Sequence, residues 1–252
     1  MKETHIFYAP NFLESNELPT DESAHAIKVL RKKVGDTITM ADGKGNFCDA
    51  TISEAHPKHC CFDIERTYPD HKLWGGNIHL ALAPTKHTDR MEWLVEKATE
   101  VGIDQITFLD CANSERHILK MERLEKIAVA AMKQSQKAFM PRLAGMVPFD
   151  KFVEGNSHAQ KFIAHCYHTD SSEKNENEIR HLSVANFLGD LVHTEGETIV
   201  LIGPEGDFSL QEVKSATNQG YTPVSLGSSR LRTETAALMA VHLMNVAKMY
   251  RG

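Results

Sequence analysis

Residues 202–206 (IGPEG) form a glycine loop in the setting of a ligand site. The loop follows the apolar run Thr198–Ile202, a predicted buried strand, and precedes residues 209–212 (SLQE), a pattern typical of a capping box at a helix start. A strand, a glycine turn and a helix N-terminus place free backbone N–H groups at the carboxyl edge of a sheet, where α/β proteins bind ligands. Gly203 and Gly206 would let the backbone approach such a ligand closely. By itself, the same sequence also fits an ordinary connection between a strand and a helix.

A second loop, residues 227–235 (GSSRLRTET), follows the predicted strand Thr222–Leu226 and contains two arginines. Thr233 is the predicted N-cap of a helix over Glu234–Tyr250. Positive charges close to a helix N-terminus oppose the helix macrodipole, so the two arginines carry a local electrostatic cost. That cost favours contact with an anion or with RNA over a purely structural, exposed basic loop.

The N-terminal residues predict a small, mostly β module. Asp21–Arg31 has the spacing of a short amphipathic helix, with Thr20 or Asp21 as its cap. Short strands with glycine turns between them indicate a small barrel or sandwich, and these strands are predicted at Thr37–Ala41, Phe47–Ser53 and Cys60–Arg66. The segment Tyr68–Asn77 contains Pro and Gly-Gly and has no periodicity, so we expect a domain boundary there, with domains at residues 1–72 and 73–252.

After this linker, strands alternate with longer helices, which indicates a parallel α/β sheet covered on both faces. The predicted strands are Ile78–Ala83, Gln105–Leu109, Lys161–Cys166, Thr198–Ile202 and Thr222–Leu226. The predicted helices are Thr88–Val101, Lys120–Lys137, Ser209–Asn218 and Glu234–Tyr250. The polar segment Ser171–Glu178 is predicted to be a loop.

The composition excludes several classes of protein. No apolar run approaches the roughly 20 residues that span a membrane, and the N-terminus lacks the apolar stretch of a signal peptide. The five cysteines are odd in number and lack the spacing of a disulfide framework, which favours reduced thiols in the cytosol. A net charge of −6 gives no support for nucleic-acid binding, although the basic cluster at 28–33 leaves room for a basic face.

Three other features have competing interpretations. Residues 56–61 (HPKHCC) suggest zinc, but adjacent cysteines on one strand point to opposite faces and no second pair completes a tetrahedral set, so we expect no metal. Trp93, at the centre of an amphipathic helix, is predicted to be a core residue, the alternative being that it stacks on a base. The helix Glu234–Tyr250 is apolar nearly all the way round, so it is expected to be buried or to lie at a subunit interface.

The chain resembles the RsmE family of SPOUT-class methyltransferases, which modify N3 of a uridine in 16S ribosomal RNA. Ile202–Ser209 (IGPEGDFS) and Leu226–Leu238 (LGSSRLRTETAAL) resemble the two C-terminal signatures of that family. Further matches, in chain order, are His25 with Val29-Leu30-Arg31, Lys86 with Arg90-Met91-Glu92-Trp93, Glu96–Glu100, Ser114-Glu115-Arg116, Gln134-Ser135 and Pro141. The resemblance covers essentially the whole chain. Two positions depart from the pattern: Asp207 stands where the family usually has a second glycine, and Lys137 where it has an arginine.

The resemblance implies a PUA-like N-terminal β-barrel and a C-terminal SPOUT α/β domain with a deep trefoil knot. It also implies S-adenosyl-L-methionine as the cofactor, bent among the knotted loops and held mostly by backbone groups. The expected cofactor contacts are Leu201, Ile202, Gly203, Glu205, Gly206, Leu226, Gly227, Ser228, Leu231 and Thr235. No GxGxxG motif follows a predicted strand, which disfavours a conventional Rossmann methyltransferase.

The same resemblance suggests catalytic and RNA-binding roles. Methylation at N3 requires the imide proton to leave, so Arg232 is the first choice for stabilising the developing negative charge, and Glu234 is a candidate for orienting that arginine or accepting the proton. The base must be unpaired or turned out of its stack, because N3 lies on its Watson–Crick edge. RNA contacts are expected from His25, Lys28, Arg31, Arg90, Arg116 and Lys137, although Lys137 lacks the planar fork of an arginine.

These expectations describe a cytoplasmic homodimer that methylates 16S rRNA in the small ribosomal subunit, with no membrane association. One alternative is a SPOUT methyltransferase acting on tRNA or on another rRNA site. A second is a non-catalytic RNA-binding protein, which binding of S-adenosyl-L-methionine would separate from an enzyme. A third is a metabolic α/β enzyme, which would show no salt-sensitive affinity for RNA.

Overall fold

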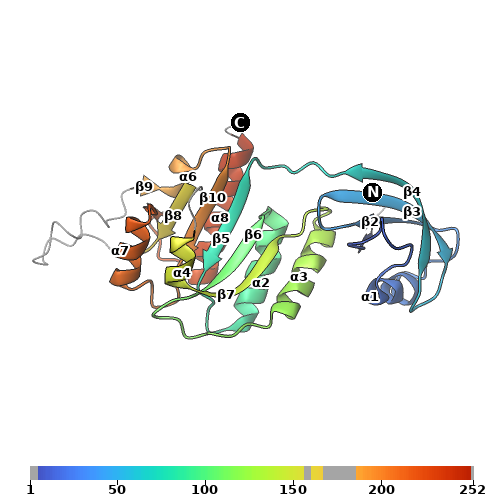
Figure 1. Ribbon diagram of the computed structural model, residues 1–252, viewed down its shortest axis with the longest axis horizontal. Helices are drawn as coiled ribbons and strands as arrows, with labels where there is room; N and C mark the ends of the chain where they lie inside the picture. Colours follow the sequence, from blue (N-terminus) through green and yellow to red (C-terminus); the bar gives the residue numbers. More distant parts are fainter. Residues whose placement is uncertain (1–4, 156–159, 167–185, 251–252) are drawn as a thin grey trace, which may run out of the picture. The chain divides into compact units, whose positions relative to one another are not determined.

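The computed structural model describes residues 5–155, 160–166 and 186–250 of the chain. Contacts within the chain divide it into two compact units (Figure 1). The N-terminal unit comprises Met1–Lys72 and Lys126–Met140, and the C-terminal unit comprises Leu73–Glu125 and Pro141–Gly252. The chain therefore returns once to the N-terminal unit, in a segment that the composition did not distinguish from its surroundings.

The N-terminal unit is built on a four-stranded sheet with the order β1-β2-β3-β4. Its strands are β1 (Ile6–Tyr8), β2 (Thr37–Ala41), β3 (Asn46–Glu54) and β4 (Cys61–Pro69). The strand predicted at Thr37–Ala41 is confirmed with the same bounds, and the small β module is confirmed with it. Alternating residues such as Ile38, Met40 and Ile52 are buried in one core with Phe7 and Phe62, which explains why the period-2 pattern was readable.

The helical segment of this unit differs from its prediction. A single helix over Asp21–Arg31 is wrong, because α1 (Thr20–Ala24) passes directly into a π-helical turn, η1 (His25–Val29). The predicted cap at Thr20 or Asp21 is also wrong, since Pro19 occupies the N-cap position and no side chain caps the helix. The N–H of Leu30 bonds to the carbonyl of His25 at 3.0 Å, which widens the last turn. Arg31 then turns the chain with a φ of 55°.

The C-terminal unit is a seven-stranded sheet with the order β7-β6-β5-β10-β8-β11-β9, and every recorded pair in it is parallel. Its strands are β5 (Asn77–Leu82), β6 (Gln105–Asp110), β7 (Arg142–Pro148), β8 (Gln160–Ala164), β9 (Asn186–Phe187), β10 (Glu197–Ile202) and β11 (Thr222–Ser225). The helices that follow in chain order are α2 (Thr88–Val101), α3 (Met121–Gln134), α4 (Phe149–Glu154), α6 (Leu188–Leu191), α7 (Leu210–Asn218) and α8 (Thr233–Tyr250). Residues 121–125 of α3 belong to this unit, and its remaining residues belong to the N-terminal one.

Helices cover both faces of this sheet, as its continuous apolar strands predicted. Ala81, Ile199 and Leu201 pack in one core with Phe152 of α4 and Val213 of α7. The alternate strand residues point to the opposite face, where α8 contacts β5 and β10 and packs along α2 (Figure 1). The parallel α/β architecture is therefore confirmed.

Strands that come late in the chain are inserted between earlier ones. β10 lies between β5 and β8, and β11 lies between β8 and β9. Consecutive strands more often lie side by side, so this interleaving is unusual for an open α/β sheet. The trefoil knot that the resemblance implies stays a prediction.

Long periodic elements were predicted better than short ones. Thr88–Val101 is a helix with the predicted bounds, whereas β1, β7, β9, α4 and α6 were not predicted. β7 is an edge strand of half-buried residues interrupted by Gly145, so its alternation is weak. The loop predicted at Ser171–Glu178 lies outside the described residues. None of the helices in the described part of the chain is long and apolar enough to span a membrane.

Candidate functional site

The first glycine loop, residues 203–209, leaves the carboxyl end of β10 at the centre of the sheet. Ile202 pairs with Leu82 of β5 and with Ala164 of β8, so the loop starts between the ends of two other strands. Gly203 is buried and Gly206 is exposed. A Cβ added to Gly203 would lie 3.0 Å from the backbone nitrogen of Phe208, so no larger residue fits there without a backbone shift. The glycine at 203 therefore permits the tight return of the chain.

The predicted capping box is confirmed and has an additional function. The Ser209 hydroxyl accepts a hydrogen bond from the Glu212 N–H at 3.2 Å, and Glu212 Oε2 accepts one from the Ser209 N–H at 2.8 Å. The other carboxylate oxygen, Oε1, accepts the N–H of Ala112 at 2.8 Å. Ala112 lies in the loop after β6, so the cap of α7 also ties two loops of this sheet edge together. The sequence pattern revealed the cap but not this second contact.

Asp207 makes further connections within the loop. Its φ is 63°, and its carboxylate accepts the N–H groups of Phe208 and of Cys166, each at 2.8 Å. The Asn113 side-chain amide donates to the Asp207 carbonyl at 3.0 Å and to the Gly206 carbonyl at 3.4 Å. The glycine loop is thus held from two sides, by the end of β8 and by the loop after β6.

The loop after β5 is bound to the same edge. Glu205 Oε1 accepts the N–H of Lys86 at 2.9 Å, and the Lys86 ammonium lies 3.0 Å from the Glu115 carboxylate. The Arg116 guanidinium donates to the carbonyls of Thr85 at 3.2 Å and Lys86 at 3.0 Å. Arg116, an expected RNA contact, and Glu205, an expected cofactor contact, are therefore both engaged with the backbone of this loop.

The second loop leaves β11 at the same edge, with β8 between it and β10. Leu226 and Leu231 are half-buried, while Gly227 and Ser228 are exposed. Gly227 has a φ of 122°, a conformation that favours glycine. Thr233 is the first residue of α8, so its prediction as the N-cap is wrong by one position.

Arg232 and Glu234 occupy different environments at the start of α8. Arg232 is exposed, and its guanidinium has no hydrogen bond or ion pair to any described residue. Glu234 is only 8% exposed, and its Oε1 lies 3.5 Å from a guanidinium nitrogen of Arg90 on α2. Its Oε2 is buried without a hydrogen-bond partner among the described residues. The structure therefore places Glu234 against Arg90 and not against Arg232. The next residue, Thr235, is half-buried.

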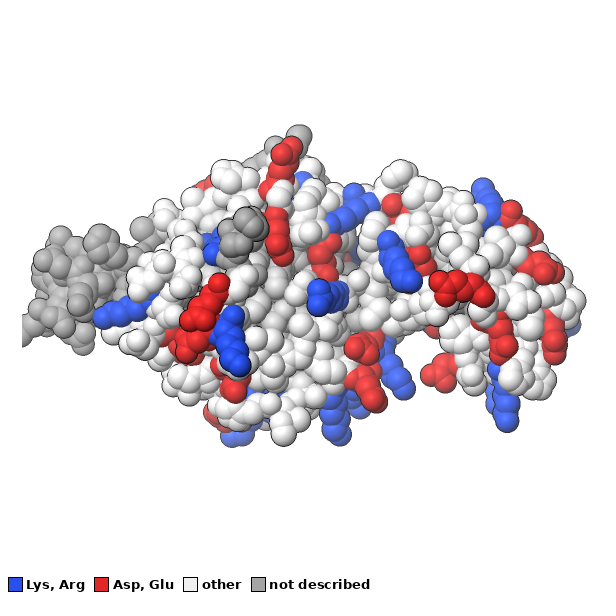
Figure 2. Space-filling view, viewed as in Figure 1, with Lys and Arg blue, Asp and Glu red and all other residues white. Residues whose placement is uncertain are grey.

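The remaining expected RNA contacts belong to the N-terminal unit. Lys28 and Arg31 are exposed at the end of the π-helical turn and just after it, and Lys137 is half-buried. The His25 ring lies 5.9 Å from the ring of Phe7, and its Nδ1 lies 4.0 Å from the Glu22 carboxylate. Figure 2 shows basic side chains interspersed with acidic ones over one face of the molecule. On the face drawn in Figure 2, the basic side chains do not gather into one large patch.

The thiols near the site are not poised as nucleophiles. Burial raises the pKa of the Cys111 thiol, and the nearby Glu212 carboxylate raises it further. Burial also raises the pKa of Cys166, with an added contribution from Asp207. A nucleophilic cysteine needs a lowered pKa, so this edge does not favour covalent catalysis through a thiolate. Among the described residues, no group of three or more His, Cys, Asp or Glu could hold a metal ion.

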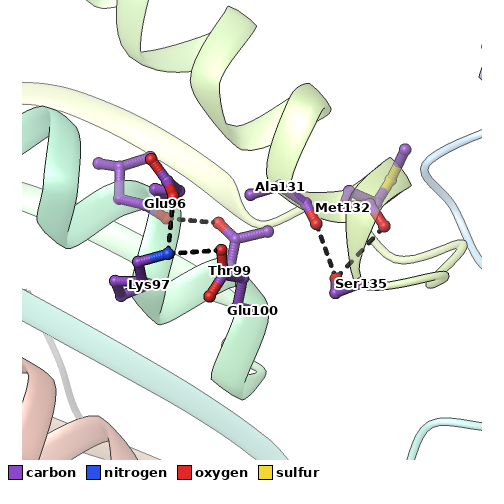
Figure 3. A network of polar contacts seen from close by, with 8 residues as sticks. Glu96, Lys97, Thr99, Glu100, Ala131, Met132 and Ser135 are labelled. Atoms are coloured by element: carbon purple, nitrogen blue, oxygen red, sulfur yellow. Dashed lines mark hydrogen bonds and ion pairs between the residues drawn. The ribbon is translucent and has the colours of Figure 1, made fainter.

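The exposed face of α2 lies outside these loops and corrects one prediction. Trp93 is not a core residue, because 41% of its surface is exposed. Close to it along the helix, the Lys97 ammonium lies 2.7 Å from Glu96 and 2.8 Å from Glu100 (Figure 3). The helix packs through Met91, Leu94, Val95 and Ala98 instead. The apolar stripe is narrower than the helical pattern suggested, and Trp93 lies at its margin.

Comparison with known proteins identifies the family. A model described as an RNA methyltransferase domain matches residues 73–245, and one described as an RNA methyltransferase PUA domain matches residues 18–65. The crystal structure of a probable rRNA-methyltransferase from Porphyromonas gingivalis is 40% identical, with a TM-score of 0.85, and the match covers 96% of this chain and 98% of that one.

Two further relatives agree in fold and in sequence. A ribosomal RNA small subunit methyltransferase E from Neisseria gonorrhoeae, solved with bound S-adenosyl methionine, is 26% identical, with a TM-score of 0.79 over 97% of this chain and 98% of that one. The ribosomal RNA small subunit methyltransferase E of Bacillus subtilis (strain 168) is 28% identical over 92% of this chain and 89% of its own length. The two-part fold with its parallel sheet and small N-terminal β module is thus shared from end to end. The chain belongs to the RsmE family of RNA methyltransferases, as its two loop signatures predicted.

Proposed function

We propose that this protein transfers a methyl group from S-adenosyl-L-methionine to N3 of a uridine in 16S rRNA of the small ribosomal subunit. One observation carries the proposal: the loops after β10 and β11 emerge at the same edge of the sheet, and each retains its family signature apart from Asp207. Relatives that match along nearly the full chain are named ribosomal RNA small subunit methyltransferase E, and one of them binds S-adenosyl methionine.

The chemistry of the two loops fits this cofactor. Gly227 has open space where a Cβ would stand, so the backbone of residues 226–228 suits close approach of a ligand, and Gly203 allows the tight turn that brings the backbone of residues 201–206 to the same edge. Half-buried Leu226 and Leu231 offer apolar surface for a purine ring. S-adenosyl-L-methionine supplies a methyl group activated by a positively charged sulfur. We assign the ten residues expected from the sequence to its binding, with Glu205 acting through the backbone of Lys86.

The catalytic groups come from the start of α8. Arg232 is exposed and free to lie beside the uracil ring, where it stabilises the negative charge that develops as the N3 proton leaves. Glu234 is a candidate to accept that proton through Oε2, while Arg90 holds its other oxygen. Arg90 would then act on Glu234 in addition to, or in place of, contacting RNA.

RNA is held, in this proposal, by the domain at residues 1–72 together with basic residues of the domain at 73–252. The proposed contacts are His25, Lys28, Arg31, Arg90, Arg116 and Lys137. Contacts of this kind neutralise phosphates and position the RNA without reading its sequence. The target uridine must be unpaired when it enters the site, since its methyl acceptor lies on the Watson–Crick edge. The reaction takes place where ribosomal subunits are assembled, so we propose a cytoplasmic protein.

We also propose a homodimer formed through α8. The exposed side of this helix carries a mostly apolar stripe with the spacing of one helix face: Thr235, Leu238, Met239, His242, Val246 and Met249. Met239 and Val246 are 38% and 37% exposed and lie within this stripe. A two-fold contact of one helix with its own copy would cover this stripe.

Introducing a charge into the stripe tests the dimer. Met239→Glu and Val246→Glu are each expected to weaken self-association by about 100-fold, because an unpaired carboxylate would be buried at the contact. Multi-angle light scattering across a concentration series measures the mass. Ile118→Glu, at an apolar residue that is 79% exposed outside α8, is the matched control and should leave the mass unchanged. Wild-type protein with a monomeric mass at high concentration would remove the homodimer from the proposal.

The function itself is tested by mapping the methylated base. The protein is incubated with methyl-labelled S-adenosyl-L-methionine and small subunits from cells that lack the modification, and the label is located by nuclease digestion and mass spectrometry. We expect 3-methyluridine in 16S rRNA. Label on tRNA alone would support the tRNA alternative, and label on a ribose oxygen would overturn the chemistry. Salt-sensitive RNA binding without any cofactor binding would indicate a non-catalytic RNA-binding protein.

A further inference from the structure

We infer that Asp207 is a positioning residue of the cofactor site: its carboxylate fixes the glycine loop to the end of β8. The inference rests on the proposed function, because it concerns how the loop is held ready for S-adenosyl-L-methionine. Asp207 is followed by the Ser209–Glu212 cap but is not part of it. Its contacts connect segments that are far apart in the sequence, so its role is not confined to the local turn.

The backbone of Asp207 is in a conformation that a non-glycine residue adopts at a cost. Its φ of 63° lies in the left-handed region, where a side chain is disfavoured by roughly 1 kcal/mol and glycine is the default. Aspartate is among the residues that enter this region most readily, because its short side chain can bond to nearby backbone groups. The Asp207 carboxylate does so by accepting the Phe208 N–H at 2.8 Å. The side chain therefore offsets part of the strain that its own presence creates.

The second oxygen of the Asp207 carboxylate bonds the glycine loop to the end of β8. Oδ2 accepts the N–H of Cys166 at 2.8 Å, just beyond the end of β8. β8 pairs with β10 on one side and with β11 on the other, so its end lies between the starting points of the two signature loops. A bond from the first loop to this point sets the loop's position relative to the segment that separates it from the second.

The same carboxylate also occupies the space above Gly203. A Cβ placed on Gly203 would lie 3.2 Å from Asp207 Oδ1, so the two residues are in close contact within the loop. On the opposite side, Asn113 donates to the carbonyls of Gly206 and Asp207. Asp207 is thus hydrogen-bonded both to the residue after β8 and to the loop after β6. Charge-assisted hydrogen bonds of this kind are about twice as strong as neutral ones, so they hold the loop more firmly than glycine could.

Removing the carboxylate should weaken cofactor binding more than it weakens folding or turnover. Asp207→Gly loses both hydrogen bonds but relieves the left-handed strain, so we expect little change in the thermal midpoint. We expect the dissociation constant for S-adenosyl-L-methionine, measured by isothermal titration calorimetry, to rise about 10-fold, which corresponds to about 1.4 kcal/mol. The kcat at saturating cofactor should stay within about twofold, because no reacting atom is touched. Asp207→Asn retains one acceptor oxygen and should fall between the two.

The controls separate this inference from the proposed function. Asp150→Asn removes an exposed carboxylate on α4 of the same unit and should bind the cofactor as the wild type does. Wild-type affinity in both Asp207 variants would overturn the positioning role while leaving the methyltransferase activity intact. If Asp207→Gly fails to fold, the Asn variant decides the question, and unchanged affinity there again overturns the inference. A wild-type protein that binds no S-adenosyl-L-methionine would refute the proposed function instead.

Discussion

Replacing Arg232 by alanine is expected to lower methyl transfer by about 100- to 1000-fold while leaving the affinity for S-adenosyl-L-methionine within about twofold. Arg232 is exposed and precedes α8 directly, and its guanidinium has no charged or hydrogen-bonding partner among the described residues. An arginine at a helix N-terminus opposes the macrodipole, so its presence there gains nothing for folding. Its guanidinium is free to meet negative charge on the uracil ring, and that charge develops only as the reaction proceeds.

Single-turnover methylation of unmodified small subunits measures the chemical step, and calorimetry measures cofactor affinity. Arg232→Lys keeps the charge and loses the planar fork, so we expect it to retain part of the activity. Lys151→Ala removes an exposed positive charge from α4 and is the matched control, with activity expected to be unchanged. Full activity in Arg232→Ala would remove this residue from catalysis. Loss of cofactor affinity in the same proportion as activity would reassign it to binding.

Replacing Glu212 by alanine is expected to destabilise the protein by about 2–3 kcal/mol, because it removes a charged acceptor from the Ser209 and Ala112 N–H groups and breaks the helix cap. For a unit of this size, that loss corresponds to a fall in the melting temperature of roughly 5–10 °C. Glu212 is 7% exposed, so water cannot replace it fully as an acceptor. The loop after β6 would also lose its tie to α7, so cofactor affinity should fall along with stability.

Differential scanning calorimetry and urea unfolding measure the effect. Ser209→Ala removes the capping hydroxyl but keeps the Glu212 contact to Ala112, so it should lose only about 1 kcal/mol. The difference between the two variants reports the hydrogen bonds of the Ser209 and Ala112 N–H groups, which only Glu212→Ala removes. Glu125→Ala, at an exposed position on α3, should change stability by no more than about 0.5 kcal/mol. Equal losses in Ser209→Ala and Glu212→Ala would show that the Ala112 contact contributes nothing.

Local sequence patterns predicted the elements that have a regular apolar period. The helix Thr88–Val101 and the strand Thr37–Ala41 were predicted with the observed bounds, because their apolar periods match the faces that they bury. The Ser209–Glu212 cap could also be predicted, because all its atoms lie within four residues. The π-helical turn at His25–Val29 could not be predicted, because a helical period of 3.6 residues gives no indication of one widened turn.

The site shows the same division between local and long-range effects. The glycine loop, and the second loop with its two arginines, were identified from residue types and spacing, and the full-length resemblance then supplied the family. The sequence did not show that Glu234 meets Arg90, that Arg116 holds the loop after β5, or that Asp207 reaches Cys166. Each of these contacts joins residues that are separated by at least 30 positions in the chain, so no local pattern encodes it.

By itself, then, the sequence determined the long periodic strands and helices, where the signature loops stand, and which family the chain resembles. Which loops lie together is determined only by the tertiary structure, through the strand order. β10 is inserted between β5 and β8, so its loop lies at the ends of both strands. Only this packing turns Asp207, Glu205 and Glu212 from ordinary loop and helix carboxylates into acceptors for the backbone of neighbouring loops. Three other segments, the end of β8 and the loops after β5 and β6, hold the glycine loop in place.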